Sequence, residues 1–353
     1  MQKPHEHQKS HGWFHHTCDR YTCLIGTLTT AYIFAFLHYY NPFDEPRSLR
    51  LVPTQQAPVP DHLNYSQWIE DPELQHETCC HYFDALLCCT NEYNGTEPKA
   101  LRFVGAAPFD AAQFFATLGG RHIAMIGDSI MRQTTSALVC ALEKVKTPLT
   151  VGKPTSFKAS KLYDFAATYE DGTKISRASM TRFDFKLLHS VMHDADILML
   201  NIGAWYNPPQ RQQYGRDMSA LGDALRSFNR RPGKRGILVD TVPQHFPTQR
   251  GSGAFSDRID GKRCVPVDPG DYSHTGADWH TQVVRRVSHE NGLQVVEVLD
   301  IFVPRWDAHL ESRPKTATSG SGNLDCTHYC HRDSVWEPLL SRIGASIRIA
   351  DGG

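Results

Sequence analysis

The sequence predicts an α/β fold, in which helices flank a doubly wound parallel sheet stabilised by disulfides and preceded by a single transmembrane anchor. Short apolar runs alternate with segments of helical periodicity from His122 onward, which is the rhythm of such a sheet. A charge-free segment, 21–40, is long enough to cross a membrane. Eight cysteines follow that segment along the chain, and their number suggests disulfides.

Length and charge limit the classes of function. The 353 residues would suit about two average domains, but the first fifty or so lack the pattern of a packed domain. One large catalytic domain over 68–350 is therefore expected. Lys and Arg number 37 against 38 Asp and Glu, a formal charge of -1. That balance gives no electrostatic reason to expect a nucleic-acid partner, which would normally need a clustered basic surface, so none is expected.

The segment 21–40 contains no Asp, Glu, Lys or Arg. At 1.5 Å per residue it can span a hydrocarbon layer of ~30 Å, so we expect a transmembrane signal anchor. A buried core helix is the alternative, and a cleaved signal peptide fits less well because twenty mostly polar residues precede the run. Residues 1–20 then form a cytosolic tail, and the proline-rich residues 41–67 form a stem.

Three features lead us to expect the body of the protein on the far side of the membrane. The basic residues before the anchor favour a cytosolic N-terminus and a lumenal or extracellular body; they are Lys3, Lys9 and Arg20. Asn64 and Asn94 begin glycosylation sequons beyond the anchor. The eight cysteines beyond the anchor suit an oxidising compartment, where disulfides form, and the sequence alone allows 105 pairings.

The central elements can be placed from periodicity. Four apolar runs are expected to be parallel strands, namely 122–126, 197–202, 236–242 and 293–299. Three segments are expected to be helices, namely 130–145, 216–230 and 277–291, the last ended by Gly292. In such sheets the active site lies beyond the carboxyl ends of the strands.

Gly127, Asp128 and Ser129 follow the first of these strands and precede a helix. A serine there lies at a helix N-terminus, where backbone N–H groups can stabilise an oxyanion, so Ser129 is a candidate nucleophile. The alternative is an ordinary N-cap serine. Asp128 is expected to cap the turn.

Asp325 precedes His328 by three residues in a loop that is expected to be pinned by cysteines. The carboxylate can accept the Nδ1 proton of the imidazole, so that Nε2 acts as a general base toward a serine. The competing interpretation is a metal site built from Cys326, His328 and Cys330. An oxidising compartment and the neighbouring Asp325 favour disulfides with a dyad, so no metal is expected.

These motifs resemble the trichome-birefringence-like, or PC-esterase, family of the SGNH superfamily. The resemblance rests on Gly-Asp-Ser with Arg132 following, and on Asp-x-x-His near the end of the chain. Five further segments match in the same order, so that the resemblance covers about 68 to 345. They are Trp68–Asp71, Phe109–Asp110, Asn201–Tyr206, Pro243–Phe246 and Arg305–His309.

The resemblance implies an SGNH-like fold and a role for each site residue. Ser129 is the nucleophile, His328 the general base and later acid, and Asp325 its orienting partner. Asn201 and Gly203, with the backbone N–H of Ser129, are the candidate oxyanion hole. Two other candidates have two interpretations each. Arg132 either binds an acyl or sugar oxygen or braces the catalytic loop. Trp205 and Tyr206 either stack on a sugar ring or pack in the core.

The same resemblance implies a disulfide between Cys264 and Cys326. Cys330 and Cys140 would then bond to two cysteines of the group 79–89. Asp307 and His309 are expected to be structural or to lie behind the reacting groups.

The implied activity is that of a Golgi, single-pass type II glycan O-acetyltransferase, with a lumenal catalytic domain and a polysaccharide acceptor. Double displacement through an acyl-serine needs no bound cofactor, and the acetyl donor, acetyl-CoA or another acetyl ester, stays open. One alternative is a carbohydrate acetyl esterase with the same triad. Another is an inactive protein that binds polysaccharide.

Overall fold

The structure is a computed structural model, and it describes residues 67–71, 74, 99–152, 162–249, 251–267, 279–312 and 324–351. The chain divides into two units, Met1–Asp61 and His62–Gly353, and every described residue belongs to the second. The predicted tail, the anchor and almost all of the stem lie outside the described residues. Within those described, no helix has the length and apolar character needed to cross a bilayer.

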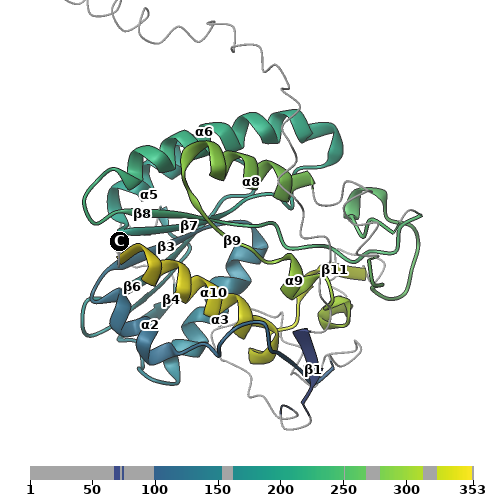
Figure 1. Cartoon of the computed structure of the whole chain (residues 1–353), viewed down its shortest axis with the longest axis horizontal. Coiled ribbons are helices and arrows are strands. Elements are labelled where there is room, and N and C mark those ends of the chain that lie inside the picture. Colours follow the sequence, from purple (N-terminus) through teal and green to yellow (C-terminus); the bar gives the residue numbers. More distant parts are fainter. Residues whose placement is uncertain are drawn as a thin grey trace, which may run out of the picture. The chain divides into compact units, whose positions relative to one another are not determined.

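A seven-stranded sheet lies at the centre of the described part of the chain (Figure 1). In spatial order its strands are β4 (Thr150–Gly152), β5 (Phe165–Thr168), β6 (Lys174–Ser179), β3 (His122–Gly127), β7 (Ile197–Asn201), β8 (Arg235–Val239) and β9 (Gln294–Val296). Neighbours from β6 to β9 are parallel, whereas β4, β5 and β6 pair antiparallel. The expected parallel sheet is therefore confirmed from β6 to β9 and wrong at the edge formed by β4 and β5.

The apolar runs explain the middle of this sheet. Every residue of β3 and β7 is buried, because helices cover both faces there. β8 ends at Val239 and β9 at Val296, both earlier than expected, and Leu299 begins the short helix α9 (Leu299–Phe302). β6 is not among the expected strands, because its residues are mostly polar and form no continuous apolar run.

Two layers of helices enclose the sheet. On one face lie α2 (Ala111–Leu118), α3 (Ser129–Glu143) and α10 (Asp333–Asp351); on the other lie α5 (Phe185–Asp194), α6 (Arg211–Asn229) and α8 (Trp279–Asn291) (Figure 1). Each layer has its own apolar core, because alternate residues of the strands face opposite sides: Met125 packs with the first layer and Ile126 with the second. The fold is thus doubly wound, as predicted, although α6 begins five residues earlier than expected, at Arg211.

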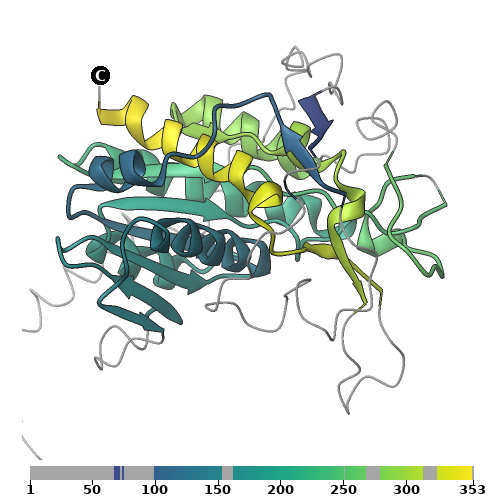
Figure 2. The ribbon, with the colours of Figure 1, turned by 90° about the horizontal axis from the view of Figure 1, so that it is seen from below.

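The predicted dyad belongs to a hairpin outside this sheet. Strands β10 (His309–Ser312) and β11 (Leu324–Tyr329) pair antiparallel, to one side of the central strands (Figure 2). Asp325 and His328 therefore lie on a strand, not in the loop that the sequence suggested. The remaining elements are β1 (Trp68–Glu70), which pairs antiparallel with β2 (Leu101–Phe103), and the 3-10 turns η3 (Pro208–Gln210), η4 (Phe255–Asp257) and η5 (Trp306–Ala308).

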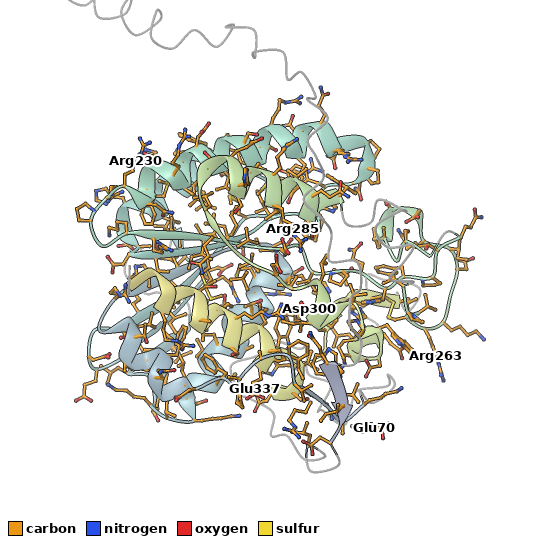
Figure 3. The ribbon with its side chains drawn as sticks, viewed as in Figure 1. Glu70, Arg230, Arg263, Arg285, Asp300 and Glu337 are labelled. Carbon is orange, nitrogen blue, oxygen red and sulfur yellow. A yellow bond between two sulfur atoms is a disulfide. The ribbon has the colours of Figure 1, made fainter. Side chains whose placement is uncertain are left out.

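A buried carboxyl group follows the end of β8. Asp240 is fully buried, and burial raises its pKa to about 7, although Arg285 of α8 (labelled in Figure 3) lies 3.6 Å from the carboxylate and opposes the shift. An unfolded aspartate ionises near pH ~4. Between these two values the unfolded chain releases a proton that the folded chain keeps, so Asp240 destabilises the fold increasingly as the pH rises from about 4 to about 7.

We predict that Asp240→Asn stabilises the protein, because a neutral amide has no charge to desolvate. The gain in free energy of unfolding should be on the order of 1–3 kcal/mol at pH 8 and smaller at pH 5, as measured by urea unfolding at both values. Asp223→Asn, at an exposed pair with Arg226, is the matched control and should change little. A gain for Asp240→Asn that is equal at both pH values would contradict the raised pKa of Asp240 in the folded chain.

Candidate active site

The turn after β3 is shaped by a close approach of two strands. Gly127 pairs with Asn201 of β7, and a Cβ atom on Gly127 would lie 2.2 Å from the carbonyl oxygen of Asn201. Only glycine fits without moving the backbone. The chain then turns into α3, whose first residue is the half-buried Ser129.

Asp128 organises this turn. It is the N-cap of α3: its Oδ1 accepts the N–H of Ile130 at 2.9 Å, and its Oδ2 accepts the N–H of Ala204, in the loop after β7, at 3.3 Å. The predicted capping role of Asp128 is therefore confirmed, and the alternative of Ser129 as N-cap is wrong. Burial raises the pKa of Asp128, while these N–H groups and the nearby His328 act to lower it.

Asp325 and His328 form a hydrogen-bonded pair. The imidazole Nδ1 lies 2.8 Å from Oδ2 and 3.1 Å from Oδ1 of the carboxylate. Oδ1 also accepts the backbone N–H groups of Thr327 and His328, each at 3.1 Å. Because the carboxylate accepts the Nδ1 proton, Nε2 is the basic nitrogen of the ring. Both side chains are buried, which limits their motion.

One side chain joins this dyad to the helix that Ser129 begins. Gln133, one turn further along α3 and 1% exposed, donates through Nε2 to the carbonyl oxygen of Tyr329 at 2.6 Å. Its Oε1 accepts the N–H of Tyr329 at 3.2 Å. The residue after His328 is thus bound through both of its backbone groups. The structure brings the turn that carries Ser129 and the strand that carries His328 together, while the catalytic roles of these residues stay predictions.

Covalent bonds reinforce β11. Cys264 and Cys326 form a disulfide with 5.5 Å between their Cα atoms, and it links β11 to the exposed segment that ends at Arg263 (Figure 3). Cys140 of α3 and Cys330, just after β11, are disulfide-bonded too. The partners predicted for them, among residues 79–89, lie outside the described residues.

The predicted oxyanion residues lie beside the turn. Asn201 uses its amide to bind the end of β8: Nδ2 donates to the carbonyl oxygens of Val239 at 3.2 Å and Asp240 at 2.7 Å. A role for this amide in an oxyanion hole would require one of those bonds to break, and it stays a prediction. Gly203 approaches Thr241 so closely that a Cβ atom would lie 2.3 Å from Oγ1. Arg132 is half-buried on α3, one turn after Ser129.

The two aromatic residues after β7 have different surroundings. Tyr206 is buried; its hydroxyl donates to Asp217 at 2.7 Å and accepts the N–H of Phe183 at 2.9 Å. A stacking role for Tyr206 is therefore wrong, because core contacts cover its ring. Trp205 is 53% exposed, and it follows Ala204, whose N–H binds Asp128. An indole thus faces solvent beside the turn that carries Ser129.

Sequence reasoning missed Gln133. Its spacing of four residues from Ser129 places both on one face of α3, and that spacing was the available signal. Its partner, Tyr329, lies 196 residues away, so no local pattern shows the contact.

Among the residues described, no group of three His, Cys, Asp or Glu could hold a metal ion.

One comparison with known proteins matches the part of the chain that includes this turn. Residues 107–233 match the model of the PC-Esterase family, described as a GDSL/SGNH-like acyl-esterase family found in Pmr5 and Cas1p. The PC-esterase part of the expected resemblance is thus supported over a segment that includes Ser129 but ends before Asp325. The trichome-birefringence-like part stays an expectation. A comparison with curated proteins gave no match.

The chain is also similar to a solved GDSL-like lipase from Bacteroides thetaiotaomicron. The identity is 10% and the TM-score 0.36, over 68% of this chain and all of the lipase chain. At that TM-score the similarity carries no information about the site.

We predict that Gln133→Met slows the reaction of Ser129 with a fluorophosphonate probe by about tenfold or more, because both backbone groups of Tyr329 lose a buried partner. Gln133→Glu keeps the acceptor for the Tyr329 N–H and should lose less. The measurement is the second-order rate of labelling of the full chain.

Thr134→Val is the matched control, because it removes a buried hydrogen bond within α3 without touching β11. All variants are compared by thermal unfolding, so that a loss of fold is recognised. Labelling of folded Gln133→Met at the wild-type rate would show that the contact does not position the site.

Proposed function

We propose that the protein is a membrane-anchored O-acetyltransferase that moves acetyl groups from a donor to glycan hydroxyls through an acyl-serine at Ser129. The observation that carries the proposal is the Asp325–His328 pair, held by Gln133 against the helix that Ser129 begins. The match of residues 107–233 to an acyl-esterase family supports chemistry on an acyl group.

The first step forms the acyl-enzyme. Nε2 of His328 takes the proton of the Ser129 hydroxyl while Oγ attacks the carbonyl carbon of the acetyl donor. The negative charge that develops on the carbonyl oxygen is stabilised by backbone N–H groups at the start of α3 and at Gly203. The donor's leaving group departs with the proton from His328, and an acetyl ester remains on Ser129. Asp325 stabilises the imidazolium that exists between these events.

The second step reverses these roles. His328 deprotonates a sugar hydroxyl, which attacks the acetyl-serine carbonyl; the acetyl group moves to the sugar oxygen, and Ser129 recovers its proton from His328. A sugar acceptor is favoured by the exposed indole of Trp205, which offers a flat apolar face beside the turn. An exposed aromatic ring is more favourably covered by the apolar face of a sugar ring than left in contact with water.

The cellular setting is part of the same proposal. Residues 21–40 would anchor the chain as a type II Golgi membrane protein, with residues 1–20 in the cytosol and Asn64 and Asn94 glycosylated in the lumen. An oxidising lumen is consistent with the disulfide between Cys264 and Cys326 of β11.

A second candidate function is hydrolysis. The family description names acyl-esterases, and water in place of the sugar hydroxyl would make the same residues an acetyl esterase. The difference lies in whether the acyl-enzyme excludes water until a sugar binds.

We predict that Ser129→Ala abolishes acetyl transfer and that Asp325→Asn lowers turnover by a factor on the order of 10⁴, since the imidazole would lose the partner that orients it. The assay incubates the full chain with an acetyl donor and a panel of glycans, and detects added acetyl groups by mass spectrometry. Near-wild-type transfer by either variant would overturn the assignment.

The same assay separates the rival functions. Loss of acetyl groups from acetylated glycans, with none gained by bare ones, would indicate an esterase. An inactive binding protein would show neither reaction, and its serine would stay unlabelled by a fluorophosphonate.

We predict that Trp205→Ala raises the KM for the glycan acceptor by about threefold to tenfold and changes kcat little, because stacking binds the acceptor without touching the reacting atoms. Trp205→Phe keeps a ring and should lose less. The measurement is initial rate against acceptor concentration at saturating donor. An unchanged KM in Trp205→Ala would exclude Trp205 from the acceptor site.

A further inference from the structure

A long connection between β8 and α8 lies beside the hairpin of β10 and β11 (Figure 2). Between Val239 and Trp279, the turn η4 is the one helix or strand in the residues that the structure describes. The connection is nevertheless held by hydrogen bonds: Phe246 donates to the carbonyl oxygen of Gly253 at 2.9 Å, and Ile259 to that of Pro247 at 2.9 Å. Long connections that are ordered in this way usually serve a function.

One side chain binds this connection to the strand of the proposed general base. Gln244 donates through Nε2 to Oγ1 of Thr327 at 3.0 Å, and its Oε1 accepts the N–H of Phe255 at 2.8 Å. Thr327 directly precedes His328. The disulfide of β11, described above, binds the far end of the same segment. Phe255 is thus held one amide away from the residue that precedes the base.

The turn η4 presents an aromatic ring and a guanidinium group to solvent. Phe255 is 44% exposed, and the buried Phe246 supports its ring, with 5.2 Å between the centroids and 72° between the planes. The guanidinium carbon of Arg258 lies 3.6 Å from the Phe255 centroid, and its Nη1 donates to the carbonyl oxygen of Phe255 at 2.9 Å. The pair is ordered in advance, so binding a ligand there costs little side-chain entropy.

Arg258 has no acidic partner within the part of the chain that the structure describes. The neighbouring Asp257 instead accepts the hydroxyl of Ser252 at 2.5 Å. Arg258 is exposed, so the other N–H groups of its planar fork are open to oxygen atoms of a ligand. An apolar ring beside fixed donors suits a sugar, whose C–H face packs on the ring while its hydroxyl oxygens accept the N–H groups.

The charge of the segment favours a neutral sugar chain. Residues 255–263 include three basic side chains against two acidic ones, a formal charge of +1; the basic ones are Arg258, Lys262 and Arg263, and the acidic ones Asp257 and Asp260. A polyanion would require a clustered excess of positive charge, which this segment lacks. Hydroxyl groups are therefore the expected partners of Arg258.

Phe255 and Trp205 are presented from the same edge of the sheet. Trp205 follows β7 and the segment of Phe255 follows β8, and these strands are parallel neighbours. Ligands of such sheets bind beyond the carboxyl ends of the strands. The two connections touch where Gly203 meets Thr241, since a Cβ atom on Gly203 would lie 2.3 Å from Oγ1 of Thr241. Two exposed aromatic residues thus come from connections that meet beside the proposed site.

We propose that Phe255 and Arg258 form a second sugar subsite, which binds a neutral glycan chain at a unit other than the one that receives the acetyl group. The protein thereby selects a chain over a short saccharide. The role in acetyl transfer rests on the proposed function, whereas binding of the chain can be measured without it. Because the subsite touches no reacting atom, it lowers the KM for long acceptors and changes kcat little.

The subsite is tested with acceptors of two lengths. Initial rates of the full chain are measured with a disaccharide and a hexasaccharide of the backbone that the panel of glycans identifies. The wild-type KM should be about tenfold lower for the hexasaccharide. Phe255→Ala and Arg258→Ala should each raise the hexasaccharide KM by about threefold to tenfold and leave that of the disaccharide unchanged. Equal effects on both lengths, or none, would overturn the proposal.

Further variants separate recognition of a sugar from recognition of charge. Phe255→Tyr keeps the ring and should keep the preference for the hexasaccharide. Arg258→Lys keeps the charge but loses the planar fork, so it should lose the preference, and it decides the matter if Phe255→Ala does not fold. A preference that persists in Arg258→Lys would overturn the neutral subsite. Leu149→Ala, at another exposed apolar position, is the matched control and should change neither KM.

Binding is measured apart from the reaction in the full-length Ser129→Ala protein. Disaccharides and hexasaccharides of β-linked glucose, mannose and xylose are titrated by calorimetry. We expect the hexasaccharide of at least one backbone to bind about tenfold more tightly than its disaccharide, and this preference to disappear when Phe255→Ala is added. No preference for length with any backbone would overturn the subsite.

The two proposals fail in different ways. Wild-type protein that neither transfers acetyl groups nor reacts with a fluorophosphonate would refute the proposed function. The calorimetry on Ser129→Ala would still decide on the subsite, because it requires no reaction.

Discussion

The proposed chemistry depends on holding β11 against α3. The strand that carries Asp325 and His328 belongs to a hairpin outside the central sheet, so the ladder of main-chain hydrogen bonds that fixes β3 and β7 does not extend to it. Its position comes instead from individual contacts. Gln133 binds both backbone groups of Tyr329, and a disulfide binds Cys326. These contacts attach the strand that carries the Asp325–His328 pair to the helix that Ser129 begins.

These contacts surround the dyad on several sides. Gln133 reaches it from α3, and His309 reaches the His328 carbonyl from β10. The backbone of His245 donates to Cys326 from the segment after β8, at 3.0 Å. Each partner comes from a different element, so displacement of any of these elements would shift the imidazole relative to Ser129. Because a shift of about 1 Å can cost 10²-fold in rate, these residues would matter to the proposed reaction without touching the substrate.

Sequence predicted the parts of this structure that a local pattern encodes. Continuous apolar runs identified β3 and β7, because burial on both faces removes polar residues from a strand. The strand β6, Lys174–Ser179, lies beside β3 yet includes a lysine, an arginine and two serines. It therefore has no apolar run from which it could be predicted. The three-residue spacing of Asp325 and His328 predicted their pairing, which the structure shows.

Contacts between distant segments could not be predicted in this way. Both stacking on a sugar and core packing are open for Tyr206 in the sequence, and the structure shows core packing, since its hydroxyl binds Asp217 and its ring is buried. The contacts of Gln133 with Tyr329 and of His245 with His309 join segments that only the fold brings together. Side-chain amides and imidazoles of this kind are common in any sequence, so their partners become visible only in three dimensions.

The most direct test is to trap the acyl-enzyme. The full chain is incubated with an acetyl donor in the absence of acceptor, quenched in acid and digested, and the peptide containing Ser129 is examined by mass spectrometry. The account predicts one acetyl group on Ser129, which disappears when a glycan acceptor is added before the quench and never forms in His328→Ala. Acetylation of another residue instead, or an ester on Ser129 that forms equally well without His328, would contradict it.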